Sequence, residues 1–173
     1  MPAFSFARQS HELSTVVAVA DLLWPVFVER NGVIFLGFVK QPTDGADHHS
    51  SITQYERFHS HTHVQDIVRW TVPRLHDVAL DLERPDSSSP EFHAAWDFAK
   101  QLAAMWLAKL MQDFPSYEFR VYATKLDDPI VHFHRIRQDE PAWLTDAEAR
   151  DAVARDELLV LDSRHVRPNL PAI

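Results

Sequence analysis

Residues 26–40, VFVERNGVIFLGFVK, contain the pattern that most limits how this chain can fold. Asn31 and Gly32 separate two runs that are rich in β-branched and aromatic residues. Asn and Gly readily take the positive φ angles that both positions of a two-residue type I′ turn require. The segment therefore predicts a β-hairpin whose loop is Asn31-Gly32.

Both faces of this predicted hairpin are apolar. Alternate residues of a strand share a face, so a two-residue loop sorts the apolar residues into two sets. The sets are Val26, Val28, Val33, Phe35 and Val39 on one face, and Phe27, Ile34, Leu36 and Phe38 on the other. Such a hairpin either lies in a sheet that is covered on both sides or offers one face to a partner chain.

Helical spacing of apolar residues predicts three long helical segments. They are residues 10–24, residues 64–82 and residues 90–114. The second segment follows a capping-box pattern, in which Thr62 and Gln65 satisfy each other's backbone amides. Pro73 interrupts this segment and must kink the helix or split it.

Shorter patterns predict the remaining elements, which are strands and one short helix. The strand-like segments are residues 51–61, a hairpin over residues 117–137 that turns at 127–129, and an edge strand at 158–161. Thr145 and Glu148 fit a further capping box, which predicts a short polar helix that ends near Glu157.

Two hairpins separated by a helical block favour the α+β class. We expect one antiparallel sheet built from both hairpins, with helices packed mainly on one face. A length of 173 residues suits one core, so residues 1–173 are predicted to form a single domain. Within it, a short linker is expected near residues 84–90 and a loosely held tail after residue 164.

Composition excludes several classes of function. The chain has 17 basic and 25 acidic residues and a formal charge of −8, which argues against binding nucleic acid or an anionic membrane surface. It has no cysteine, so disulfides, thiolate nucleophiles and iron–sulfur clusters are excluded. Three glycines are too few and too scattered for a phosphate-binding loop. No apolar run approaches a membrane span or a signal peptide, so cytoplasmic residence is expected.

Alternating histidines make a metal site the main candidate for chemistry. His59 and His61 share a face if residues 51–61 form a strand, and His132 and His134 repeat the alternation on the second hairpin. Together with the carboxylate of Asp66 they would suit a divalent metal such as zinc or iron. The same residues are also ordinary at a junction before a helix or on a strand that faces water, and this interpretation is favoured.

Four residues are candidates for contact with a partner. Arg135 and Arg137 follow one another on the second hairpin, where guanidinium groups could receive a carboxylate or phosphate. Trp70 lies outside the apolar face of its predicted helix, and Trp143 lies in a loop before a capping box. Arginine and tryptophan concentrate binding energy at interfaces, so these positions indicate an interaction surface.

Three functions are compatible with these patterns. The favoured hypothesis is a non-enzymatic interaction module, an accessory, regulatory or neutralising subunit that binds a protein partner or associates with itself. The second is a His/carboxylate metal-dependent enzyme, either a hydrolase or an oxygenase. The third is a protein that binds a small apolar ligand. The first is preferred because the chain presents no complete catalytic motif and carries a marked acidic charge.

Overall fold

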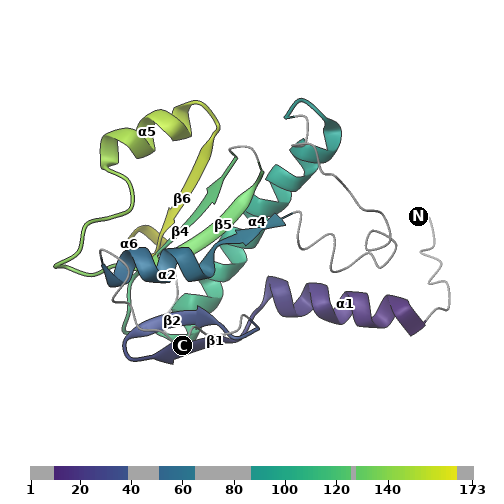
Figure 1. Cartoon of the computed structure of the whole chain (residues 1–173), viewed down its shortest axis with the longest axis horizontal. Coiled ribbons are helices and arrows are strands. Elements are labelled where there is room, and N and C mark those ends of the chain that lie inside the picture. Colours follow the sequence, from purple (N-terminus) through teal and green to yellow (C-terminus); the bar gives the residue numbers. More distant parts are fainter. Residues whose placement is uncertain (1–9, 39–50, 65–86, 126–127, 167–173) are drawn as a thin grey trace.

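The computed structural model describes residues 10–38, 51–64, 87–125 and 128–166 (Figure 1). In chain order the elements are α1 (Ser10–Leu23), β1 (Phe27–Arg30), β2 (Val33–Leu36), α2 (Ile52–Ser60), β3 (Thr62–His63), α4 (Pro90–Asp113), β4 (Phe119–Thr124), β5 (Ile130–Arg135), α5 (Asp146–Ala154), β6 (Leu158–Asp162) and α6 (Ser163–Val166). Helices and antiparallel sheets together confirm the α+β class. The predicted helical segment after Val64 lies outside the described residues.

The strands form two antiparallel sheets, whereas the sequence led us to expect one. One sheet pairs β1 with β2, and the other has the strand order β3-β5-β4-β6. Both predicted hairpins are present, but helix α2 contacts β2 on one side and β5 on the other. The side chain of Glu56, from α2, accepts the amide of Ile34 at 2.8 Å and the amide of Arg135 at 2.6 Å. These backbone donors are therefore satisfied by the helix and not by a neighbouring strand.

The first hairpin has the predicted two-residue loop. Arg30 pairs with Val33, and Asn31 and Gly32 have φ angles of 53° and 78°. Its two apolar faces are covered differently. Phe27, Ile34 and Leu36 belong to the main core, while Val33 and Phe35 pack with Tyr55 of α2. Each face is thus covered in part, whereas Val26 and Phe38 are 70% and 44% exposed.

Helix α4 supplies most of one wall of the main core. It begins as expected, because the Ser89 side chain accepts the amide of Phe92 at 3.1 Å and Pro90 occupies the first turn. Its buried residues are Phe92, Trp96, Ala99, Leu102, Ala103, Trp106, Leu107 and Leu110. All of these except Phe92 belong to the main core, together with Val121, Val131 and Phe133 from one face of the four-stranded sheet. The indole of Trp106 also donates to the carbonyl of Leu22, at 2.9 Å, which attaches the end of α1.

The register of β4 and β5 decides where the two strand histidines lie. Val121 pairs with Phe133 and Tyr122 pairs with His132. Since Val121 and Phe133 face α4, the side chains of Tyr122 and His132 lie on the opposite face of the sheet. We call this the outer face. His134 shares it, and both histidines are almost fully buried there.

Two local predictions around residues 51–65 are wrong in part. Residues 52–60 form helix α2 and not a strand, because the Ser51 hydroxyl accepts the amide of Gln54 at 3.1 Å and starts a helix. Thr62 lies in strand β3, and its hydroxyl donates to the carbonyl of Ser60 at 3.1 Å instead of capping a helix. Gln65, the other half of that predicted box, lies outside the described residues.

The short helix and the edge strand predicted near the carboxyl end are confirmed, whereas most of the tail predicted after residue 164 lies outside the described residues. Thr145 and Glu148 form the expected capping box at the start of α5. Strand β6 lies at the edge of the four-stranded sheet, beside β4. In the described part of the chain, no helix combines the length and the apolar character that crossing a membrane requires.

Candidate functional site

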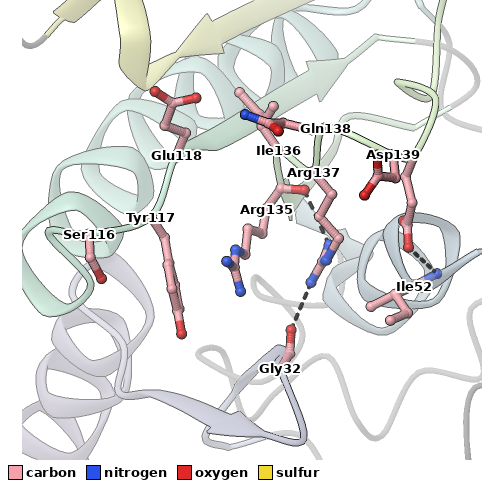
Figure 2. A pocket seen from close by; sticks show the side chains of 11 residues that line it. Gly32, Ile52, Ser116, Tyr117, Glu118, Arg135, Ile136, Arg137, Gln138 and Asp139 are labelled. Carbon is pink, nitrogen blue, oxygen red and sulfur yellow. Dashed lines mark hydrogen bonds between the residues drawn. The ribbon is translucent and has the colours of Figure 1, made fainter.

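An open cleft of about 670 Å³ lies where the second hairpin ends (Figure 2). Its walls come from the turn of the first hairpin, the start of α2, the segment before β4 and the segment after β5. The lining residues include Gly32, Ile52, Tyr117, Glu118, Arg135, Arg137, Asp139 and Glu140. We call it the arginine cleft, because Arg135 and Arg137 leave strand β5 side by side along it (Figure 2).

Arg137 is held rigidly by Glu56. The two guanidinium nitrogens Nη1 and Nη2 reach the two carboxylate oxygens of Glu56 at 2.9 Å and 3.1 Å. Nη2 also donates to the Gly32 carbonyl at 2.8 Å, so Arg137 joins α2 to the turn of the first hairpin. Glu56 has no exposed surface, and its charge is fully compensated by these bonds and by two backbone amides. Arg137 therefore builds the wall of the cleft and has little charge to offer a ligand.

Arg135 is held in a different way. Its guanidinium carbon lies 3.6 Å from the centre of the Tyr117 ring, in a cation–π contact. The Tyr117 hydroxyl in turn donates to Glu29 at 2.9 Å, and this bond is the main reason that the pKa of Tyr117 is raised. In the described part of the chain, no acidic side chain forms an ion pair with Arg135. Stacking thus orients the group, and no carboxylate within the described residues pairs with its charge.

Glu140 closes the cleft beside the start of α2. Its carboxylate accepts the amides of Ile52 at 3.2 Å and Thr53 at 2.5 Å. Burial by itself raises the pKa of Glu140, but the bonds from Thr53 and Ile52 outweigh it and the pKa is lowered. A carboxylate bound to the first amides of a helix also compensates the positive end of the helix dipole.

The cleft has a mixed charge. Arg135 and Arg137 line it together with three acidic residues, Glu118, Asp139 and Glu140. Since Arg137 and Glu140 are occupied by internal bonds, the groups left for a ligand are the Arg135 cation and the carboxylates of Glu118 and Asp139. This arrangement suits a ligand that combines one anionic group with basic or amide groups.

The outer face of the sheet holds a second, buried cluster of rings. Tyr122 lies between His132 and His134, with ring centres 5.0 Å and 5.6 Å away. The Trp143 ring stands nearly perpendicular to the rings of Tyr122 and His132, with ring centres 5.1 Å and 4.6 Å away. The guanidinium carbon of Arg57, from α2, lies 4.8 Å from the centre of the Trp143 ring. Trp143 is therefore half-buried over the cluster, although its loop position suggested a more exposed role.

The histidines of this cluster are kept neutral. Burial lowers the pKa of His132 well below its usual value, and burial likewise lowers the pKa of His134 to about 4. His134 Nδ1 donates to the Arg135 carbonyl at 3.0 Å, so its Nε2 accepts from the Tyr122 hydroxyl at 3.2 Å. A neutral imidazole satisfies both bonds. These contacts give His134 a structural role behind the arginine cleft.

The predicted metal ligands are not brought together in the described residues. His59 lies in α2 and packs with Tyr55 and Phe35, away from strand β5. His61 stacks with His132 at 6.2 Å, while His134 bonds to Tyr122. Across the described ranges, no three His, Asp or Glu side chains are placed to hold a metal ion. Asp66 lies outside those ranges, so the five-residue metal site stays a prediction.

The partner-binding candidates have different outcomes. Arg135 and Arg137 both line the arginine cleft, Trp143 covers the ring cluster, and Trp70 lies outside the described residues. We did not predict from the sequence the roles that Tyr117, Glu140 and Glu56 have at the arginine cleft. One signal was present for Glu56: Ser51 and Gln54 have capping-box spacing, which would have placed Glu56 on a helix.

Comparisons of the chain with protein-family models, with curated proteins and with solved structures found no match.

Proposed function

We propose that this chain is a non-enzymatic binding module that receives a carboxylate-bearing segment of a partner protein in the arginine cleft. The observation that carries the proposal is Arg135, whose guanidinium is stacked on Tyr117 in the wall of an open cleft. The neighbouring Arg137 has its charge compensated by Glu56. The cleft therefore offers one oriented cation on a wall that is already rigid. We retain the expectation that the protein acts in the cytoplasm.

A carboxylate fits this arrangement because of the geometry of arginine. Stacking uses the face of the guanidinium and leaves its N–H groups at the edge, where two parallel bonds to a carboxylate can form. Arginine and tyrosine are also the residue types that contribute most at protein interfaces. Pre-orientation by Tyr117 lowers the entropy that Arg135 loses on binding.

A protein segment fits better than a nucleic acid. Glu118 and Asp139 also line the cleft, and the whole chain has a formal charge of −8, so a polyanion would be repelled. A peptide that presents one carboxylate among basic or amide groups would find a cation for its carboxylate and carboxylates for its other groups.

Site-directed photocrosslinking in native host cells tests the proposal. The crosslinking residue replaces Gln138, which lines the cleft, and in a matched control it replaces Gln101, which is exposed on α4. We expect position 138 to capture one predominant protein that position 101 does not capture. Arg135→Glu should abolish this crosslink, whereas Arg155→Glu on the exposed end of α5 should preserve it. Equal capture from both positions, no capture at 138, or insensitivity to Arg135→Glu would each contradict the proposal.

The metal-dependent enzyme has one observation in its favour. His61 Nε2 lies 3.1 Å from His63 Nε2, and His63 Nδ1 lies 2.6 Å from a carboxylate oxygen of Asp128. A carboxylate behind a histidine is a common second contact at metal centres. Elemental analysis of untagged protein distinguishes the two functions. Stoichiometric zinc or iron that disappears in a His61→Ala, His63→Ala double variant would favour the enzyme over the binding module.

A further inference from the structure

A second cavity lies on the outer face of the four-stranded sheet, against helix α5. It has a volume of about 740 Å³ and lies beside β4, β6, α5 and α6. Its apolar surface comes from Tyr122 and Val160 on the sheet and from Ala149 and Val153 on α5. We call it the α5 groove. The volume is within the range of about 300–1,000 Å³ that is usual for small-molecule sites.

Helix α5 contacts β6, but its hydrogen bonds to distant residues lie just after its end. At its start, Thr145 and Glu148 cap each other. Just after its end, Asp156 accepts hydrogen bonds from the Trp96 indole at 3.3 Å and the Lys125 ammonium at 2.9 Å. None of the residues within α5 is buried, and Val153, which lines the groove, is 48% exposed. Among the described residues, the side of the helix that faces the sheet therefore has less packing than such a helix normally has.

The groove carries more positive than negative charge, unlike the chain as a whole. Its charged lining residues are three arginines, Arg120, Arg150 and Arg164, and two aspartates, Asp146 and Asp162. Arg120 and Arg164 both bind Asp162, at 3.0 Å and 2.6 Å. One carboxylate cannot use all the N–H groups of two guanidiniums. The pair therefore keeps N–H donors at this end of the groove, where the negative charges of Asp146 and Glu118 also lie near Arg164.

We propose that the α5 groove binds a small amphipathic monoanion, an apolar molecule with a single carboxylate. Its apolar body fills the space between α5 and Val160, and its carboxylate meets the guanidiniums of Arg120 and Arg164. A carboxylate accepts from those donors, whereas a neutral apolar ligand would leave them unused. This site is separate from the arginine cleft, and it does not depend on the function proposed for that cleft.

Titration with decanoate, followed by two-dimensional amide NMR and by calorimetry, tests the site. We expect saturable binding with shifts concentrated on α5, β6 and Tyr122. Ala149→Trp places a large side chain in the groove and should weaken binding at least tenfold. Ala147→Trp is the matched control, since residues two apart lie on opposite sides of a helix and Ala147 does not line the groove. Equal affinities of the two variants, or no binding of decanoate, would overturn the proposal.

A charge series tests the anionic end independently of the tryptophan variants. Arg164→Gln should weaken decanoate binding about tenfold and leave the weaker binding of decanol unchanged. Arg155→Gln, which removes an exposed arginine outside the groove, should change neither. If decanol or decylamine binds the wild-type protein as tightly as decanoate, or if both arginine variants behave alike, the carboxylate assignment is wrong. Thermal unfolding of each variant confirms that it is folded at the titration temperature.

Discussion

At the scale of single residues, Glu56 and Arg137 form a buried ion pair whose members depend on each other. The Glu56 carboxylate is fully buried and accepts from two backbone amides as well as from Arg137. Removing Arg137 leaves a buried charge without its counter-ion, which costs about 3–5 kcal/mol. Arg137→Ala should therefore lower the free energy of unfolding by about that amount, measured by urea denaturation.

Arg135→Ala is the matched control for this prediction. Arg135 lies two residues away and stacks on Tyr117, without an ion pair in the described residues. Its loss should cost only about 0–1 kcal/mol. Similar losses of stability in the two variants would show that Glu56 and Arg137 do not form the buried pair that holds this wall.

The buried His134 makes stability depend on pH. Its pKa of about 4 in the folded protein lies below that of an unfolded histidine, near 6.5, because burial disfavours the charged form. As the pH falls through this interval, the unfolded chain binds the proton first, so stability is complete above pH ~6.5 and is lost toward pH ~4. His134→Gln should reduce the loss of stability between pH 7 and pH 5 by about 1–2 kcal/mol.

The control for this prediction is His93→Gln, which changes an exposed histidine on α4. It should leave the pH dependence of the free energy of unfolding close to that of the wild type. Identical profiles for His134→Gln and His93→Gln would mean that His134 is not held neutral by the fold.

Prediction from sequence succeeded at residues whose role is local. Asn31 and Gly32 take positive φ angles, and Thr145 caps α5, because the backbone geometry of a turn or helix start depends on a few neighbours. It failed for Tyr117 and Glu140, which act through partners 88 and 87 positions away in the chain. No local pattern encodes such contacts.

At the scale of elements, helix α2 shows how a local pattern can be misread. The sequence led us to expect a strand over residues 51–61, but Ser51 and Gln54 start a helix there. Glu140 adds a long-range contact by accepting the amides of Ile52 and Thr53. The cap is visible in the sequence, whereas the support from Glu140 depends on the fold.

Glu140→Ala should therefore loosen α2 in particular. Losing an acceptor at the start of a helix costs about 1 kcal/mol. We expect faster amide hydrogen exchange in the first turn of α2, while exchange in β4 and β5 stays unchanged. Asp139→Ala is the control, because Asp139 is an exposed neighbour. If amide hydrogen exchange in α2 is as fast in the Asp139→Ala variant as in the Glu140→Ala variant, the contact with Glu140 does not stabilise this helix.

At the scale of the whole molecule, two small sheets share one core. The main core combines Phe27 and Leu36 from the first hairpin with α4 and the four-stranded sheet. The sequence indicated both hairpins and the long helix, because each has a clear period. Their separation into two sheets depends on Glu56, which joins β2 to β5 from a helix that the pattern did not reveal.

This arrangement predicts how the molecule opens. In the wild type, Glu56 and Arg137 bind the turn of the first hairpin to the end of β5. The most protected amides of both sheets should therefore exchange their hydrogens through the same global unfolding. Glu56→Gln removes the charge and weakens the bonds to Ile34 and Arg137. Exchange in β1 and β2 should then become faster than exchange in β4 and β5, because the two-stranded sheet can open by itself. If protection falls equally in both sheets, the first hairpin is held by its apolar contacts with α4 and not by the Glu56 bridge.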